Sequence, residues 1–345
     1  MKRTSILLAL SLAFAFSASA TILRVNNTPG SDAPYDNFTT AHASAVPGDT
    51  IQIEGSNTPY GELTITKRLV VIGPGYFLNE NPNTPVSLPA TTANINLDRT
   101  NANDPFSGAS GTEIMGLRVR QTSASRVNVR VSNVSISKCE IDDYVYIQDL
   151  DGIVSGVQVF QNFFYGTGLN WVPASDGLTN FNFSNNIVLG PFSVPDNSTG
   201  GIYHNVFLGN GFNAELFAGE IRSNIATTTN TNNFNVSTSG NGQVSHNTAA
   251  NGQFGASNGN NVASPDDIFA GPNGNSTDGQ YQLLPGATAV RNNAHDGTDR
   301  GAFGGSRPYS LSGLGNIPAI VYLEVPASGT ASQPFTVTIR AVSGN

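Results

Sequence analysis

Charge, cysteine and long apolar runs are all scarce in this chain of 345 residues. Charged residues make up only 12% of the sequence, and acidic ones are in excess, giving a formal net charge of −8. A chain of this kind, with no stripe of lysine and arginine, is a poor partner for nucleic acid or an anionic membrane. Its single cysteine, Cys139, excludes an internal disulfide, so packing and backbone hydrogen bonds must hold the fold together.

The N-terminus has the pattern of an export signal. Lys2 and Arg3 precede an apolar run from Ile6 to Phe16, and small residues from Ala18 to Ala20 form a cleavage pattern. The run is too short to cross the roughly 30 Å of a bilayer's hydrocarbon core as a helix. The sequence therefore predicts a cleavable signal peptide over residues 1–20, a secreted or cell-surface protein, and no transmembrane segment.

What the sequence has in abundance points to a solenoid. Glycine occurs 37 times and proline 19 times, and short runs of Ile, Val, Phe and Leu recur throughout. Six segments of similar pattern end in one column of residues, spaced 23, 24, 19, 19 and 23 positions apart. The column contains Cys139, Asn162, Asn186, Asn205, Asn224 and Asn247. Counting a further 23 positions upstream places Gly116 in the same column.

The residues around this column predict short strands. Apolar residues recur three positions before the column and often directly after it, which no amphipathic helix would require. We expect the asparagines to adopt left-handed turns and to bond to each other between layers, with Cys139 as a structural replacement. Rungs of about 22 residues between positions 48 and 300 predict roughly eleven coils.

The two ends of the repeat predict caps. Asp36 or Asn37 can cap a short helix that runs through Val46 and plugs the first coil. Strands over residues 320–325 and 335–340 predict a hairpin that caps or trails the last coil. The expected organisation is a signal peptide over 1–20, a β-helix with its N-terminal cap over 21–310, and a C-terminal hairpin and tail over 311–345.

Over residues 35–305 the chain resembles the pectin-lyase-like superfamily of secreted right-handed parallel β-helices. Besides the asparagine column, the resemblance rests on the stretch from Asn37 to Tyr76, which looks like a helix cap and first rung. It also rests on 265–269, 279–283 and 299–305, which look like a closing coil. The implied fold is an all-β right-handed solenoid, a scaffold that hosts lyases, hydrolases, esterases, adhesins and inert spacers alike.

In such lyases an arginine or lysine base lies beside carboxylates that bind calcium, and the resemblance directs attention to a similar juxtaposition here. A basic island contains Arg118 and Arg120, and an acidic one follows a rung later with Asp142 and Asp143. By the 23-residue spacing, Arg120 should lie under Asp143. In the lyase interpretation Arg120 and Asp143 are catalytic, and Asp142 and Asp143 hold calcium. The competing interpretation is stacked ion pairs on a sheet face.

Histidines and aromatic residues provide weaker candidates for a functional site. His204 and His246 lie two rungs apart, too far to share one metal ion, and His42 and His295 are expected at opposite ends of the solenoid. Asp296 and Asp299 fit a turn better than a calcium loop. Tyr165 and Trp171 lie in a longer excursion between rungs, where either ring could stack on a sugar.

Two functions follow from these observations. The favoured one is a secreted or cell-surface solenoid that is structural, adhesive or in contact with a polysaccharide or cell-surface glycan, without catalysis. The alternative is a polysaccharide lyase or hydrolase acting on a glycan that contains uronic acid. No cofactor is predicted, except calcium in the lyase interpretation.

Overall fold

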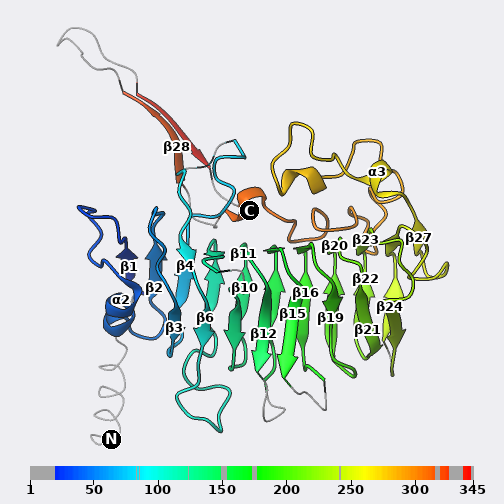
Figure 1. The fold of residues 1–345 in the computed structure, drawn as a ribbon, viewed down its shortest axis with the longest axis horizontal. Coiled ribbons are helices and arrows are strands. Elements are labelled where there is room, and N and C mark those ends of the chain that lie inside the picture. Colours follow the sequence, from blue (N-terminus) through cyan, green and yellow to red (C-terminus); the bar gives the residue numbers. More distant parts are fainter. Residues whose placement is uncertain are drawn as a thin grey trace, which may run out of the picture.

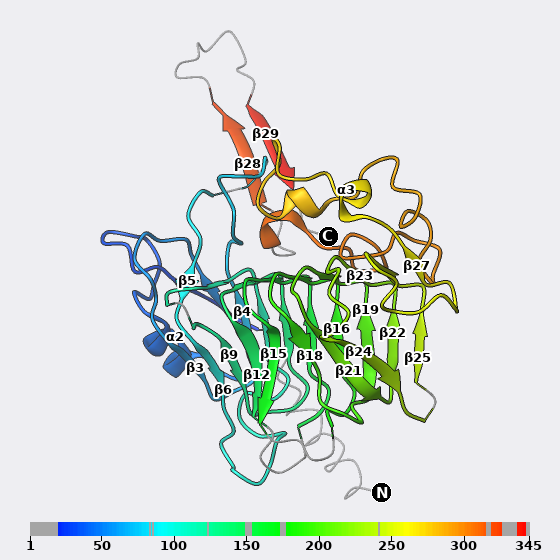
Figure 2. The same ribbon diagram turned by 45° about the vertical axis from the view of Figure 1, so that its right-hand side comes forward.

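The chain forms a parallel β-solenoid, seen from two sides in Figures 1 and 2. The computed structural model describes residues 20–342, except 83, 85, 123, 149–153, 173–176, 241, 315–318 and 326–336. The predicted signal peptide thus lies outside the described residues, apart from Ala20. Among the described residues, no helix has the length and apolar character needed to cross a membrane.

Three faces of parallel strands surround the solenoid core. The first is a ten-stranded sheet, made of β1 (Ile22–Val25), β2 (Thr50–Ile53), β4 (Val70–Ile72), β7 (Glu113–Met115), β10 (Ser135–Ser137), β13 (Gln158–Phe160), β16 (Phe181–Ser184), β19 (Gly200–Tyr203), β22 (Glu220–Arg222) and β25 (Gln243–Ser245). The second is a nine-stranded sheet, made of β5 (Thr91–Thr92), β8 (Arg118–Val119), β11 (Glu140–Ile141), β14 (Phe163–Phe164), β17 (Ile187–Val188), β20 (Val206–Phe207), β23 (Ile225–Ala226), β26 (Thr248–Ala249) and β27 (Asn261–Val262).

The third face is divided into two sheets. One contains β3 (Leu63–Ile65), β6 (Ile95–Leu97), β9 (Val127–Val129), β12 (Tyr144–Gln148) and β15 (Gly168–Val172). The other contains β18 (Phe192–Ser193), β21 (Phe212–Phe217) and β24 (Phe234–Thr238). The solenoid has about eight turns, and the prediction of eleven is wrong. Part of the excess arose because residues beyond 262 were counted as coils, whereas the chain there leaves the solenoid. The rest arose because some rungs are long: Val70 pairs directly with Glu113, 43 residues further along.

Asparagine side chains form a ladder inside the turn between the ten-stranded and nine-stranded sheets. From Asn162 to Asn247 each amide nitrogen donates to the amide oxygen of the next ladder residue at 2.9–3.2 Å, ending on Asn260. Each backbone N–H, including that of Cys139, donates to the same oxygen at 2.8–2.9 Å. The six predicted column residues are fully buried, so the ladder satisfies polar groups that water cannot reach.

The left-handed backbone does not lie at the ladder asparagines, as the sequence had suggested, but one residue before them. There φ is between +53° and +60°. We call these six residues the left-handed column: Lys138, Gln161, Asn185, His204, Ser223 and His246. In the preceding turn Gly116 holds the same conformation, so Gly116 aligns with Lys138 and not with Cys139. The rung between them has 22 residues, one fewer than the count used above.

Residues 263–314, which we call the return segment, run back along the outside of the solenoid (Figures 1 and 2). The segment contains α3 (Pro265–Ile268) and two short 3-10 helices, η1 (Gly279–Tyr281) and η2 (Leu311–Gly313). Its Ile268, Leu283 and Val290 pack in a second apolar cluster on the outer side of the nine-stranded sheet. That side presents Phe163, Ile187, Val206 and Ile225, the apolar residues directly after the ladder. The segment that was expected to form a closing coil therefore covers one face of the solenoid instead.

The ends of the chain differ in how they attach. Helix α2 (Phe38–Ser44) is capped by the Asn37 side chain, which accepts from the Thr40 N–H, and it buries Phe38 in the main core beside the first strands. At the other end β28 (Ala319–Glu324) and β29 (Thr338–Val342) pair antiparallel. The return segment ends beside Tyr76, so this hairpin lies near the first coils and does not cap the last one.

Candidate functional site at the last coils

The charged island predicted from the sequence is a set of ion pairs. Arg118 contacts Glu140 at 3.1 Å, and Arg120 contacts both Glu140 and Asp142 at 3.1 Å. Strand pairing sets Arg118 opposite Glu140, which brings Arg120 over Asp142. The predicted partner of Arg120, Asp143, is one residue beyond the observed partner, Asp142, because this rung has 22 residues and not 23. Glu140 is 1% exposed and is bridged by both guanidinium groups.

This arrangement keeps Arg120 protonated, so it cannot act as a base. Partial burial lowers its pKa, but the Glu140 carboxylate and the Tyr165 phenol outweigh that effect and raise the pKa above its ordinary value. Its guanidinium also lies 3.7 Å from the centre of the Tyr165 ring. A guanidinium held by two carboxylates and an aromatic face is poorly suited to remove a proton from a substrate.

The predicted calcium ligands Asp142 and Asp143 differ in their surroundings, and the two candidate sugar-stacking residues lie apart. Partial burial, together with the charge of Asp142, raises the pKa of Asp143, and Asp142 is already bonded to Arg120. Tyr165 follows β14 on the nine-stranded sheet, whereas Trp171 lies in β15 on the five-stranded sheet. The two rings are thus on different faces of the solenoid, and each could stack on a sugar only by itself.

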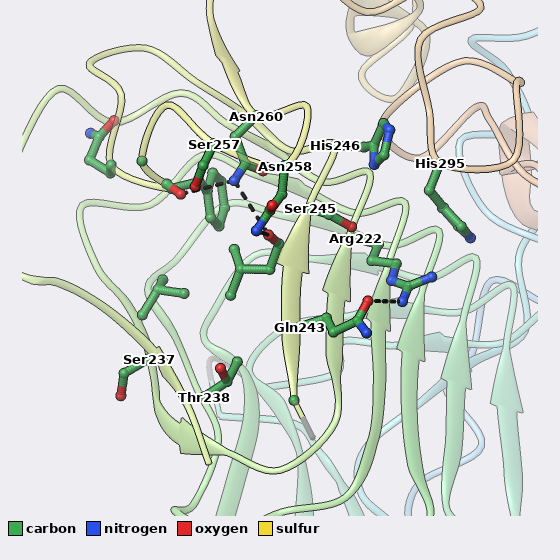
Figure 3. Close-up of a pocket in the computed structure, with 16 residues that line it drawn as sticks. Arg222, Ser237, Thr238, Gln243, Ser245, His246, Ser257, Asn258, Asn260 and His295 are labelled. Atoms are coloured by element: carbon green, nitrogen blue, oxygen red, sulfur yellow. Dashed lines mark hydrogen bonds between the residues drawn. The ribbon is translucent and has the colours of Figure 1, made fainter. Parts of the chain in front are cut away.

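The structure instead has a cavity of about 1010 Å³ over its last coils (Figure 3). Strands β22, β24 and β25, the loop from Gln253 to Asn260 and the return segment contribute to its wall. The side chains labelled in Figure 3 are Arg222, Ser237, Thr238, Gln243, Ser245, His246, Ser257, Asn258, Asn260 and His295. No aspartate or glutamate is among the described residues that line it, although the chain as a whole is acidic.

Side chains that can donate hydrogen bonds line much of this cavity. Arg222 donates to Gln243 within it and to Glu220 at 2.6 Å beside it, while its Nε atom is buried without a partner. His246 Nδ1 is also buried without a partner. Partial burial and nearby cationic and histidine side chains lower the pKa of His246, so its ring is neutral at pH 7. The cavity is thus suited to oxygen-rich ligands, whose hydroxyl or carboxylate groups accept from these donors.

The return segment brings His295 to this cavity, and the expectation that it lies far from the other histidines is wrong. Its ring centre is 5.5 Å from that of His204 and 6.1 Å from that of Tyr203. The Ser223 hydroxyl bonds to His295 Nδ1 at 2.9 Å and accepts from its backbone N–H at 3.0 Å. Spacing along the repeat could not reveal this contact, because it depends on a segment that leaves the repeat.

One sequence signal could have indicated the cover. Ladder asparagines point inward, so the residues directly after them point outward, and four of these in succession are Phe or aliphatic. A row of outward apolar side chains requires a partner. Comparison with known proteins gave no further guidance, since no family model, curated protein or solved structure matches this chain.

Proposed function

We propose that this protein is a non-catalytic solenoid, secreted or displayed at the cell surface, that contacts a glycan through the cavity over its last coils. The observation that supports it most is the cavity wall, rich in donors and free of carboxylates among its described residues. Such a wall favours a sugar bearing hydroxyl and carboxylate groups, because the amides and hydroxyls can bond to them and Arg222, paired on one side with Glu220, adds a positive charge. The export-signal pattern of residues 1–20 supports the location, and the resemblance to right-handed pectin-lyase-like solenoids supports the scaffold.

The alternative of a lyase or hydrolase has less support. Its proposed base, Arg120, is bound to Glu140 and Asp142, and its proposed metal ligands are not joined by a third ligand among the described residues. The polar groups of the island neutralise each other, as cross-strand ion pairs do on any sheet. The island therefore fits a structural role.

The test is a glycan panel, with and without calcium, on the protein lacking residues 1–20. Binding, unsaturated-uronide absorbance and new reducing ends are followed together. We expect binding of uronate-containing glycans without product release. Calcium-dependent product release that Arg120→Ala or Asp143→Ala abolishes would overturn the proposal in favour of the lyase. Absence of binding across the panel would overturn the glycan contact.

Two variants locate the binding site. Arg222→Gln and Gln243→Ala should each weaken binding by about tenfold or more, because each removes a cavity donor. Arg24→Gln is the matched control, since Arg24 also pairs with a glutamate at 2.6 Å but lies in β1 at the other end of the solenoid. Equal losses in Arg222→Gln and Arg24→Gln would show that charge alone, and not the cavity, drives binding.

A further inference from the structure

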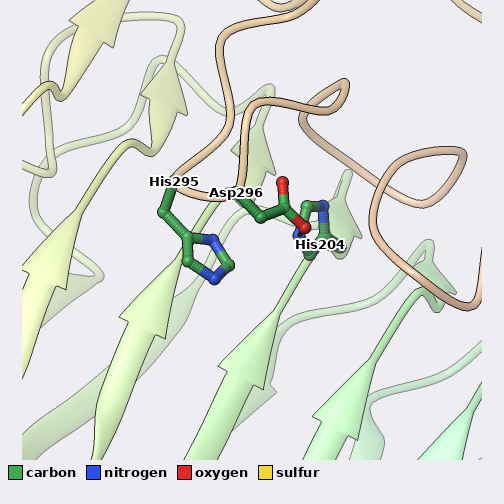
Figure 4. A group of neighbouring side chains, drawn as sticks. All are labelled: His204, His295 and Asp296. Atoms are coloured by element: carbon green, nitrogen blue, oxygen red, sulfur yellow. Dashed lines mark ion pairs between the residues drawn. The ribbon is translucent and has the colours of Figure 1, made fainter.

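Three potential metal ligands from two distant parts of the chain meet at the left-handed column, of which His204 is a member. His204 follows β19 in the solenoid, whereas His295 and Asp296 lie in the return segment (Figure 4). One nitrogen of each imidazole and one carboxylate oxygen all lie within 4.8 Å of one another. Among the described residues, no other set of three His, Cys, Asp or Glu side chains has this geometry.

His204 is the residue that calls for an explanation. It is 4% exposed, and neither ring nitrogen makes a hydrogen bond of good geometry, although the Asp299 backbone and the Asp296 carboxylate lie beside the ring. Buried polar atoms in proteins are nearly always bonded, and a bound water or ion is one way to satisfy a buried imidazole whose contacts are this poor. The glycines at 304 and 305 pack against the ring, because a Cβ at either position would approach it to 3.0 Å.

The distance between His204 and Asp296 fits a shared ion better than a hydrogen bond. Their Nε2 and Oδ2 atoms are 3.4 Å apart, which is long for a hydrogen bond between a nitrogen and a carboxylate oxygen. Two ligands at about 2.0–2.1 Å from a tetrahedral zinc ion lie roughly 3.3 Å from each other. Only a small displacement of these two side chains is therefore needed to hold a zinc ion.

The other two ligands are positioned by bonds to neighbouring groups. The second carboxylate oxygen of Asp296, Oδ1, accepts from the Thr298 N–H at 3.1 Å and from the Thr298 hydroxyl at 2.6 Å, which leaves Oδ2 toward His204. Ser223 anchors His295 through its backbone and its ring. Outer contacts of this kind orient the ligands in metal sites.

We propose that His204, His295 and Asp296 bind a divalent transition-metal ion, zinc in the first instance, that fastens the return segment to the solenoid. Two imidazoles and one carboxylate form a ligand set that suits zinc and leaves a fourth position for water. The proposal uses none of the donors assigned to glycan binding except His295, which lines the cavity edge. It holds or fails independently of that function.

The test measures zinc binding by calorimetry on untagged protein stripped with a chelator, and the absorption of the cobalt-substituted form. Wild type should bind about one ion per chain and melt at a higher temperature with zinc present. His204→Asn and Asp296→Asn should each weaken zinc binding by about tenfold or more. Asparagine suits both positions. At position 204 it can adopt the left-handed conformation, as Asn185 does one rung earlier, and at position 296 its amide oxygen can still accept from Thr298.

His246→Asn is the matched control, because His246 occupies the same left-handed column two rungs further along. It should bind zinc as wild type does, and all variants should melt at nearly the wild-type temperature without zinc. The proposal is overturned if wild type binds no zinc near pH 7.5, if both ligand variants keep full affinity, or if His246→Asn loses as much affinity as they do.

Discussion

Tyr76 and Tyr309, 233 positions apart in the sequence, share a hydrogen bond of 2.6 Å between their hydroxyl oxygens inside the protein. Tyr309 also donates to Asp278 at 3.3 Å, and the same carboxylate oxygen accepts from the Ser312 N–H at 2.7 Å. Both tyrosines are buried, at 0% and 4% exposure. The network joins the first coils to the end of the return segment, so it should contribute to the stability of the whole molecule.

We expect Tyr309→Phe to lower the free energy of unfolding by about 1–3 kcal/mol, because it leaves the Tyr76 hydroxyl and Asp278 short of a partner. Tyr76→Phe should cost less, and the double variant should cost less than the sum of the two. Urea denaturation of the four proteins measures this coupling. Tyr146→Phe, a half-buried tyrosine on β12, is the control and should shift stability by less than about 0.5 kcal/mol. Strict additivity would contradict a shared network.

The asparagine ladder predicts a large effect from one amide. Asn205→Ala removes four buried hydrogen bonds: two to its oxygen from Asn186, and two from its amide nitrogen to Phe183 and Asn224. The free energy of unfolding should fall by about 3–5 kcal/mol, since several buried groups lose their partners at once. Asn235→Ala, on the exposed side of β24, is the control. A similar small change in both variants would argue against a structural role for the ladder.

Cys139 should be inert while the protein is folded. Its thiol is fully buried and donates to the Ser137 carbonyl at 3.1 Å, and burial raises its pKa to about 12. Thiol reagents attack the thiolate, so labelling in native buffer at pH 8 should be at least about tenfold slower than in denaturant. The reaction with a chromogenic disulfide reagent measures both rates. Fast labelling of the native protein would contradict the buried position.

Lys138 should make stability depend on pH. Burial lowers its pKa from 10.5 to about 8, in a region where Glu113 and Arg307 line the same cavity. Below pH 8 both folded and unfolded chains hold the proton, and the cost of burying the charge is constant. Between pH 8 and 10.5 the unfolded chain binds more protons than the folded one, so this residue favours folding increasingly as pH rises.

Lys138→Asn isolates that effect, since Asn185 holds the same backbone conformation two rungs away. We expect the variant to be more stable than wild type at pH 7, by about 1–3 kcal/mol, and the difference to shrink toward pH 10. Urea denaturation of both proteins across this pH range makes the comparison. A difference that stays constant would show that Lys138 does not lose its proton in the folded state.

The repeat made the solenoid predictable, because residues at a fixed spacing must occupy equivalent places in successive layers. The same logic failed where the spacing changed: a single missing residue between Leu117 and Cys139 moved Arg120 from Asp143 to Asp142. It also misassigned the left-handed backbone to the asparagines, because either of two adjacent residues could make the turn. Sequence periodicity defines the layers, but it does not determine to within one residue which side chains face each other in neighbouring layers.

The meeting of His204 with His295 and Asp296 could not be predicted in this way. Nothing local in the sequence around Asp296 shows that the chain has turned back, and the turn pattern there fits a closing coil equally well. The contact depends on apolar side chains such as Val290, which pack on the outer face of the solenoid and decide the path of the segment. Candidate sites built by such long-range packing require the structure.

A solenoid normally folds through neighbour contacts, and its coils can unravel one at a time from either end. The return segment changes that behaviour, because the last part of the chain bonds to Tyr76 and Asn81 in the first coils as well as to the middle ones. Fraying at the first coils is therefore opposed by the return segment, which follows all the coils in the sequence. Folding should remain incomplete until the return segment is available, and unfolding should become a single concerted event in place of a stepwise one.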